Sequence, residues 1–288
     1  MRLHEYEALD IFEQNRIPVP RRGVANTMHE ALDIAGEIGY PVILKAQVLV
    51  GGRGLAGGIK TASSPDELKD IADSLLSSEI KGLSVRKILV CEKLEIEKEL
   101  YLGITIDGYS GKPVIVVSTE GGVLIEETAR TSPEKIAAIH IDPSFGYYPY
   151  QARGLLKMLG LKQQLVTAWS EIIGRLFNIV LRYESLIAEI NPLAVLPNGG
   201  LFAVDADFHD NDAGVDGPFL RRHVEFQPHI DNRHDRAAQI DDAFHIVRCL
   251  RHLGHVGVVK NFPDLSHIQG EDFFRHFKGQ ILSGLHNF

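Results

Sequence analysis

The residues of this sequence that could do chemistry begin with a run of glycines. Residues 51–58 read GGRGLAGG, so five of eight are glycine, and Lys45 precedes the run by six residues. Gly52, Gly54 and Gly57 fit the pattern G-x-G-x-x-G, which is typical of loops that bind dinucleotides. The run also approaches a P-loop, but it lacks the terminal Lys-Ser/Thr. A surface loop without a ligand is the third possibility, and the entropic cost of so many glycines favours a function.

The elements around the glycines exclude both common motifs. Apolar residues predict strands over 41–46 and 59–62, and the next helix starts only at Ser64, a typical N-cap. Both motifs need a helix directly after the last glycine, because the helix N-terminus meets the phosphates. The run is therefore predicted to be a flexible loop between two strands, with backbone N–H groups free to face phosphate oxygens. Lys45 would add a point charge and Arg53 a guanidinium fork.

A second group of polar residues lies in the segment AEINPLAVLPNGGLFAVDAD. Its PNGG sequence predicts a turn centred close to Asn198, so the numbers of facing residues add up to about 396. Asn191 then lies opposite Asp205. Glu189 lies opposite Asp207, and alternation along the strands puts all four side chains on one face. Three carboxylates and an amide oxygen suit Mg²⁺ shared with phosphates. The alternative is a solvated polar face, although like charges directly opposed repel each other unless a cation lies between them.

The surrounding elements predict an α/β (α+β) fold that positions these two groups. Apolar periodicity indicates helices at 3–15, 28–38, 149–159 and 162–183, and strands at 87–92, 99–107 and 113–119. Beyond a boundary near 208–216 the periodicity weakens, and ten of the thirteen histidines lie between His209 and His286. Helices are expected in this last part at 236–252 and 271–284.

Composition limits the class of protein. The 288 residues carry a formal net charge of −8, which argues against a nucleic-acid-binding surface. No apolar run reaches the roughly 18 residues that would span a membrane. Glu5, Glu7 and Asp10 make the first residues too acidic for a secretory signal or a mitochondrial transit peptide. Two distant cysteines indicate a reducing compartment, so a cytoplasmic protein is expected.

Several long motifs carry a family resemblance. They read LHEYEALDIF, KAQVLVGGRGLAGGIK, KELYLGITID, STEGGVLIEE, YPYQARGLLKMLGL and AEINPLAVLPNGGLFAVDA. Over residues 1–208 the chain resembles the β subunit of succinyl-CoA synthetase (succinate–CoA ligase), whose N-terminal part is an ATP-grasp domain. Subunits of malate–CoA ligase and citryl-CoA synthetase share much of this pattern. The resemblance implies an ATP-grasp fold with two α+β subdomains, of which a lid-like one covers about residues 21–104.

The resemblance also implies a role for each matching residue. Glu189 would be the catalytic residue, because it would meet a phosphohistidine that a partner α subunit swings in. Asn191 and Asp205 would bind Mg²⁺. The nucleotide site would comprise Lys45 at the ATP phosphates, Gly52, Arg53 and Gly54 along the nucleotide, Cys91 and Leu94 at the adenine-contacting hinge, and Glu99 as an acidic ligand.

The implied reaction is the reversible conversion of succinyl-CoA, nucleoside diphosphate and phosphate into succinate, CoA and nucleoside triphosphate, a step of the tricarboxylic acid cycle. The family assembles as an αβ heterodimer or a heterotetramer. ATP/ADP is the favoured nucleotide, since Pro20 near the expected purine side offers no base-specific hydrogen bond, and GTP stays open. The sequence does not identify the dicarboxylic acid, so a malate or citrate ligase subunit is an alternative.

This sequence also departs from the family. Cys91 stands where the family usually has Glu, with Glu92 beside it, and Asp207 stands where the family commonly has Lys. Residues 209–288 form a divergent His-rich tail in place of the expected flavodoxin-like domain, as a truncated or frame-shifted chain would. His229 and His234 have a metal-ligand spacing, but solvated or packed histidines are expected there. A module that binds nucleotide without turnover is therefore the competing function.

Overall fold

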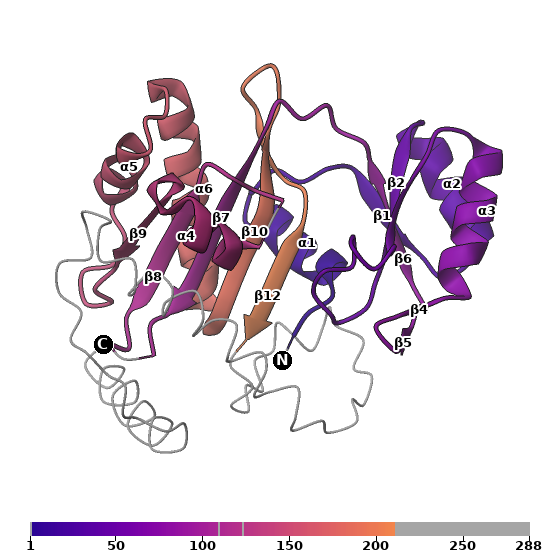
Figure 1. Ribbon diagram of the computed structural model, residues 1–288, viewed down its shortest axis with the longest axis horizontal. Helices are drawn as coiled ribbons and strands as arrows, with labels where there is room; N and C mark the ends of the chain where they lie inside the picture. Colours follow the sequence, from indigo (N-terminus) through magenta and orange to yellow (C-terminus); the bar gives the residue numbers. More distant parts are fainter. Residues whose placement is uncertain (1, 109, 123, 211–288) are drawn as a thin grey trace.

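The structure, a computed structural model, describes residues 2–108, 110–122 and 124–210. These residues form two α+β units that lie next to each other, each built on its own antiparallel sheet (Figure 1). The observed class therefore agrees with the predicted α/β (α+β) fold. In the described ranges, no helix combines the length and the apolar character that crossing a membrane requires.

The small unit carries a four-stranded sheet in the order β1-β6-β2-β3. These strands are β1 (Arg22–Ala25), β2 (Val42–Ala46), β3 (Ile59–Ala62) and β6 (Ile88–Glu92). Two helices, α2 (Met28–Ile38) and α3 (Pro65–Leu76), pack on one face of the sheet over a core of small aliphatic side chains. A short hairpin of β4 (Glu79–Ile80) and β5 (Leu83–Ser84) extends from this unit.

Local signals fix the ends of both helices of the small unit. Thr27 and Ser64 each accept a hydrogen bond from the backbone three residues further on, at the starts of α2 and α3. Gly39 follows α2 with a φ of 92°, a conformation that favours glycine. The caps agree with the sequence-based expectation. Residues 51–58 lie between β2 and β3, so the glycine run connects two strands as predicted.

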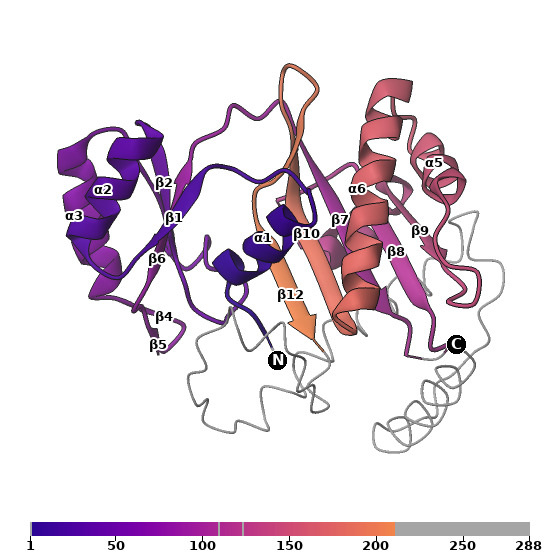
Figure 2. The same ribbon diagram turned by 180° about the vertical axis from the view of Figure 1, so that it is seen from behind.

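The large unit carries a six-stranded sheet in the order β11-β10-β7-β8-β9, with β12 also paired to β10. Its strands are β7 (Lys98–Ile106), β8 (Pro113–Ser118), β9 (Ile136–His140), β10 (Ser185–Val195), β11 (Leu201–Ala203) and β12 (Ala206–Asp210). One face is covered by α1 (Glu5–Gln14), α5 (Pro149–Met158) and α6 (Gln163–Arg182), which lie in front of the strands in Figure 2. A smaller cluster on the other face packs under α4 (Ile125–Thr131).

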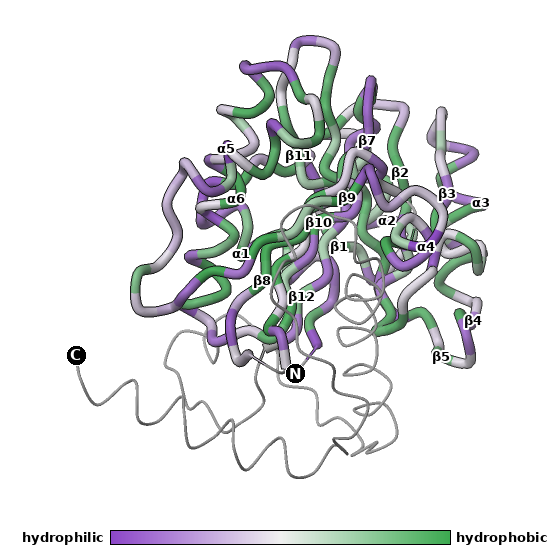
Figure 3. Tube along the Cα trace, turned by 60° about the vertical axis from the view of Figure 1, so that its left-hand side comes forward, coloured by the Kyte–Doolittle hydropathy of each residue, from purple (hydrophilic) through white to green (hydrophobic). Residues whose placement is uncertain are grey.

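Apolar stripes on these helices form the core of the large unit. Leu9 and Phe12 of α1 are fully buried, as the predicted stripe requires. Trp169 of α6 is also fully buried in this core, which agrees with a packing role. A hydrophobic stretch follows β8 in Figure 3 (green), and every residue of this strand is buried. The helices thus hold the sheet that carries the polar residues of interest.

The hairpin over residues 185–210 has the register that its turn predicts. Glu189 is paired with Asp207, and Leu193 is paired with Ala203. The residue numbers of each pair add up to 396, the predicted value. The second arm is split into β11 and β12, and the backbone N–H of Asn191 reaches across to the carbonyl of Asp205 at 3.2 Å.

Other features differ from the sequence-based expectation. The whole of β7 belongs to the large sheet, so the small unit ends before residue 98 rather than near 104. The short elements β1, β9 and α4 were not predicted, because each has seven residues or fewer and shows little periodicity. The helices expected at 236–252 and 271–284, the histidine pair of the tail and the nature of residues 211–288 lie outside the described residues.

Candidate functional site

Lys45 lies on β2 and points across to the large unit. Its Nζ is 2.6 Å from Oε1 of Glu5 on α1, and it donates to the carbonyl of Val204 at 2.8 Å. Both side chains are buried. Burial lowers the pKa of Lys45, but the charges of Glu5, Asp205 and Cys91 and the hydrogen bond to Glu5 together raise it above its ordinary value. The ammonium therefore stays charged between the two units.

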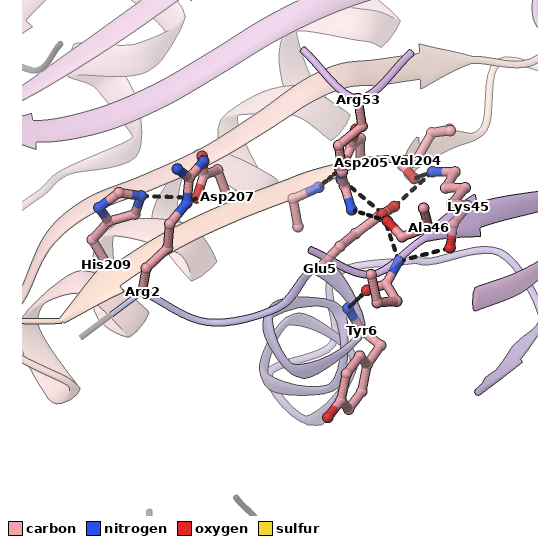
Figure 4. Close-up of polar contacts among 12 residues, drawn as sticks. Arg2, Glu5, Tyr6, Lys45, Ala46, Arg53, Val204, Asp205, Asp207 and His209 are labelled. Carbon is pink, nitrogen blue, oxygen red and sulfur yellow. Dashed lines mark hydrogen bonds and ion pairs between the residues drawn. The ribbon is translucent and has the colours of Figure 1, made fainter. Parts of the chain in front are cut away.

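Arg53 of the glycine run joins the same ionic network. Its Nη2 lies 2.8 Å from Oε2 of Glu5 and 3.0 Å from Oδ1 of Asp205, and its Nη1 donates to the carbonyl of Ala46 at 3.2 Å. Figure 4 shows Arg53 reaching Glu5 and Asp205 from the loop above them. The structure thus brings together the predicted phosphate-binding residues and a predicted metal ligand.

The backbone of the glycine run folds tightly around Arg53. The N–H of Gly58 donates to the carbonyl of Arg53 at 2.8 Å, and Gly52 has a φ of 69°. Lys81 of the β4–β5 turn donates to the carbonyl of Gly51 at 2.7 Å. Gly52 and Gly54 themselves are exposed, so their backbone is accessible to a ligand.

Asn191 and Asp205 meet where the strand ladder is interrupted. The pairing of β10 with β7 shifts register between Ile190 and Leu193, a bulge that contains Asn191. Such bulges often redirect side chains next to functional sites. Asn191 Oδ1 accepts the N–H of Gly122 at 2.7 Å, and Asp205 Oδ1 accepts the N–H of Ala206 at 2.9 Å. Asn191 and Asp205 are therefore neighbours across the hairpin, joined by a backbone hydrogen bond, and Asp205 lies beside Arg53.

These two residues fit a magnesium site that is completed by phosphates. Mg²⁺ commonly takes one or two protein oxygens and fills its other positions with water and phosphate. Asn191 and Asp205 supply this number of hard oxygen donors, and Asp205 already lies against the positive charge of Arg53. Across residues 2–108, 110–122 and 124–210, no set of three or more His, Cys, Asp or Glu side chains is arranged to hold a metal by itself.

Glu189 lies on β10 beneath the hydroxyl of Tyr101, which donates to its Oε2 at 3.3 Å. Burial, together with the charge of Asp207, raises the pKa of Glu189 to about 8. Gly103 is paired with Glu189, and a Cβ at this glycine would collide with the Tyr101 side chain. The glycine therefore leaves the space that lets Tyr101 reach Glu189.

Asp207 contacts two basic side chains within the described residues. Arg2 forms an ion pair with its carboxylate, and Nε2 of His209 lies 2.9 Å from Oδ1 (Figure 4). Burial alone would raise the pKa of Asp207, but the hydrogen bond and charge of His209 and the charge of Arg2 lower it to about 2. Arg2 and His209 thus offset the charge of Asp207, and the raised pKa of Glu189 favours its neutral form. Both effects reduce the expected repulsion between the two carboxyl groups.

The hinge position is occupied by a buried thiol. Burial raises the pKa of Cys91 to about 12. Cys91 packs with Leu89 in the core of the large unit, whereas Val90 packs in the core of the small unit. Glu92 therefore lies on the opposite face of β6 from Cys91, and its carboxylate pairs with Arg21 at 3.1 Å.

Glu99 is the second residue of β7, the strand paired with β10, and Leu94 lies half-buried in the connection before β7. Gly122 approaches Glu99 so closely that a Cβ there would collide with the carboxylate. Gly122 also has a φ of 72°, and its N–H reaches Asn191. Gly122, in the loop after β8, thus lies against two of the predicted site residues, Glu99 and Asn191.

Sequence reasoning missed Glu5, Arg2 and Gly122 as parts of the site. The paired glycines in STEGG signal a close backbone approach, so Gly122 could have been found. Glu5 carried a weaker signal, since an acidic residue in the first turn of a helix is commonly explained by the helix dipole. Its partners are 40 and more residues away in the sequence.

Comparisons with known proteins bear on this site. Residues 2–195 match the model of the ATP-grasp domain. An ADP-forming succinate–CoA ligase subunit beta from Haloarcula marismortui is 40% identical over 269 residues, which cover 91% of this chain and 67% of that protein. Proteins of the same name from Herpetosiphon aurantiacus and Pyrobaculum arsenaticum are 44% and 38% identical, over 75% and 97% of this chain. The chain spans 57% and 73% of the lengths of these two relatives.

Solved structures share the fold at low identity. The dinucleotide forming acetyl-coenzyme A synthetase 1 of Ca. Korarchaeum cryptofilum, in complex with coenzyme A, Ca-AMPCP and HgCl⁺, has a TM-score of 0.61 at 22% identity. The match covers 73% of this chain and 93% of that one. The ATP citrate lyase of Methanothrix soehngenii, in complex with citrate and coenzyme A, also has a TM-score of 0.61, at 16% identity over 84% of this chain and 60% of that one.

The family model, the curated relatives and the geometry of the two units agree. The chain therefore belongs to the ATP-grasp family and, within it, to the family of β subunits of ADP-forming succinate–CoA ligases.

Proposed function

We propose that this chain is the nucleotide-binding β-type subunit of an ADP-forming succinate–CoA ligase, and that it supports phosphoryl transfer between ATP/ADP and a histidine of a partner α subunit. One observation supports this most directly. The glycine run of the small unit and the hairpin of the large unit meet through Arg53 and Asp205, whose atoms are 3.0 Å apart. A nucleotide held by the glycine run would thus place its phosphates next to Asn191 and Asp205.

Each residue would contribute by position and charge. Lys45 and Arg53 would bind phosphate oxygens, with the backbone of Gly52 and Gly54 alongside. Asn191 and Asp205 would hold Mg²⁺, which would neutralise charge on the phosphates. The other expected contacts are those of Leu94 and Cys91 with the base, and of Glu99 with the nucleotide. For Cys91 only the strand backbone fits this role, because its thiol is turned into the core.

Glu189 would meet the phosphohistidine segment of the α subunit. It lies on the same strand as Asn191, with the hydroxyl of Tyr101 orienting it. Holding two reacting groups in register is the main contribution that a protein makes to phosphoryl transfer. An α subunit, CoA and succinate are therefore the partners of this proposal, in a cytoplasmic step of the tricarboxylic acid cycle.

Phosphoryl transfer to an α subunit tests the proposal. The full chain and its cognate α subunit are mixed with ATP labelled on the γ-phosphate and with Mg²⁺, and label on the α subunit is measured. We expect label in the wild-type mixture and at least a hundredfold less with Asp205→Ala, because the loss of phosphate neutralisation costs several kcal/mol. Nucleotide binding without label transfer and without an α–β complex would instead support the binding module that does not turn over.

A further inference from the structure

The first turn of α1 places a carboxylate between the two cations expected to bind phosphate. The Glu5 side chain is fully buried. One of its oxygens is 2.6 Å from Nζ of Lys45, and the other is 2.8 Å from Nη2 of Arg53. Gln47 adds a hydrogen bond to the second oxygen at 3.3 Å. As Figure 4 shows, Lys45 from β2 and Arg53 from the glycine run converge on Glu5.

Glu5 neutralises two cations that are largely removed from water. A buried ammonium or guanidinium needs a counter-charge, since removing it from water costs several kcal/mol. Burial would raise the pKa of Glu5, but the charges of Lys45 and Arg53 lower it below its ordinary value. The carboxylate is therefore ionised at neutral pH and bound to the same two groups that a phosphate would need.

A carboxylate and a phosphate compete when they bind the same cations. Arg53 has five N–H donors and Lys45 has three, and in this structure each of them gives one contact to an oxygen of Glu5. An incoming phosphate brings further negative charge close to Glu5. The two anions repel each other, so part of the nucleotide's binding energy is opposed by Glu5.

We propose that Glu5 is the internal counter-anion of the nucleotide site, a positioning residue that holds Lys45 and Arg53 together and lowers nucleotide affinity by competing with the phosphates. This inference rests on the proposed function. It goes beyond that function because no role in nucleotide binding was expected of α1. Arg53 extends the same arrangement, since it pairs with Asp205 at 3.0 Å and exchanges this contact for phosphate when nucleotide binds.

The proposal predicts that one substitution lowers the stability of the unbound chain and raises its affinity for nucleotide. Glu5→Gln keeps the shape of the side chain but removes its charge, so Lys45 loses its carboxylate partner and Arg53 keeps only Asp205. Phosphates supply that charge again, and the variant is therefore harmed less with nucleotide than without it. By linkage, a change that harms the unbound chain more than the complex tightens binding. A purely structural role of Glu5 would lower stability without raising affinity.

The test measures ADP binding to the full chain by calorimetry with Mg²⁺, together with the melting temperature with and without ADP. For Glu5→Gln we expect binding to be about fivefold tighter or more. We also expect its melting temperature without ADP to fall by on the order of 10 °C, with a smaller fall at saturating ADP. Glu13→Gln is the matched control, because Glu13 is an exposed carboxylate of the same helix that pairs with Arg22; its ADP affinity stays unchanged.

Glu5→Asp provides a second variant if Glu5→Gln does not fold. The shorter side chain keeps the charge but cannot maintain both contacts, so ADP binding tightens by a smaller factor. Equal or weaker binding in the variant that folds overturns the inference, provided that the wild-type chain binds ADP. A wild-type chain that binds no ADP overturns the proposed function first, so the two failures are distinguishable.

Discussion

Gly122 shows how the absence of a side chain serves the site at the scale of one residue. A Cβ at this position would collide with the carboxylate of Glu99, and its φ of 72° favours glycine. Gly122→Ala should therefore displace Glu99 and weaken nucleotide binding about tenfold, since a lost contact to a charged group is worth about 1.5–3 kcal/mol. The measurement is the dissociation constant of ADP for the full chain.

Gly146→Ala is the matched control for this prediction. Gly146 has nearly the same φ, 71°, but no atom lies within 4 Å of the position of its Cβ. Both substitutions should lower the free energy of unfolding by about 1–2 kcal/mol through backbone strain. Only Gly122→Ala should change ADP affinity, and equal affinities of the two variants would show that Glu99 does not bind the nucleotide.

Single residues differ in how far the sequence predicts them. Lys45 and Arg53 were found because glycines and strand patterns are local signals. Asn191 and Asp205 were placed together by the symmetry of a hairpin around its turn, and the observed register agrees. Glu5 was not found, since its contacts depend on how α1 packs against β2, which no local pattern encodes.

At the scale of the element, α1 contributes stability that depends on pH. The folded chain lowers the pKa of Glu5 from an ordinary value of 4.5. This contribution is therefore complete above pH 4.5 and is lost as the pH falls through the lower, folded pKa. Removing one partner of a buried ion pair typically costs about 3–5 kcal/mol. The free energy of unfolding of the wild type should exceed that of Glu5→Gln by about 3–5 kcal/mol at pH 7. This difference should shrink below pH 4.5.

Urea unfolding at several pH values measures this difference. Carboxyl groups distant from Glu5 are common to both proteins, so their protonation cancels when the two are compared. Asp205 is the exception, because burial and the charge of Glu5 raise its pKa to about 6 and the variant lacks the second cause. Glu13→Gln again serves as the control, with a nearly constant difference from wild type across the same range. A constant difference for Glu5→Gln would mean that Glu5 is not an ionised partner of Lys45 and Arg53.

The elements themselves were predicted where the chain repeats a pattern for long enough. α2, α3 and α6 have caps or long apolar stripes, and the structure places them where the sequence does. α4 has seven residues and no side-chain cap, so it lacks both signals. The end of the small unit was placed too late, because β6 and β7 are both apolar strands and nothing in either indicates which sheet it joins.

At the scale of the whole molecule, nucleotide and Mg²⁺ should stabilise the arrangement of the two units. A ligand at one hundred times its dissociation constant adds about 2.7 kcal/mol, which corresponds to a rise of about 5–10 °C in melting temperature for a domain of this size. We expect this rise with ADP and Mg²⁺, and a clearly smaller one with ADP and EDTA, because Asn191 and Asp205 would lose their shared cation.

Two variants test the origin of this thermal shift. Asp205→Ala should abolish the difference between Mg²⁺ and EDTA. Asp142→Asn removes a half-exposed carboxylate that pairs with Lys112 in a different part of the large unit, and it should keep the full shift. An equal shift with and without Mg²⁺ in the wild-type chain would contradict the assignment of Asn191 and Asp205.

The buried Trp169 is an intrinsic fluorescence probe of the large unit. It is the only tryptophan of the 288 residues, and it lies in the core between α6 and the large sheet. Tryptophan emission therefore follows the solvation of the large unit alone, whereas circular dichroism follows the backbone of both units. Agreement of the two unfolding curves would show that the units melt cooperatively. An earlier transition in circular dichroism would show that backbone outside the core around Trp169 opens first.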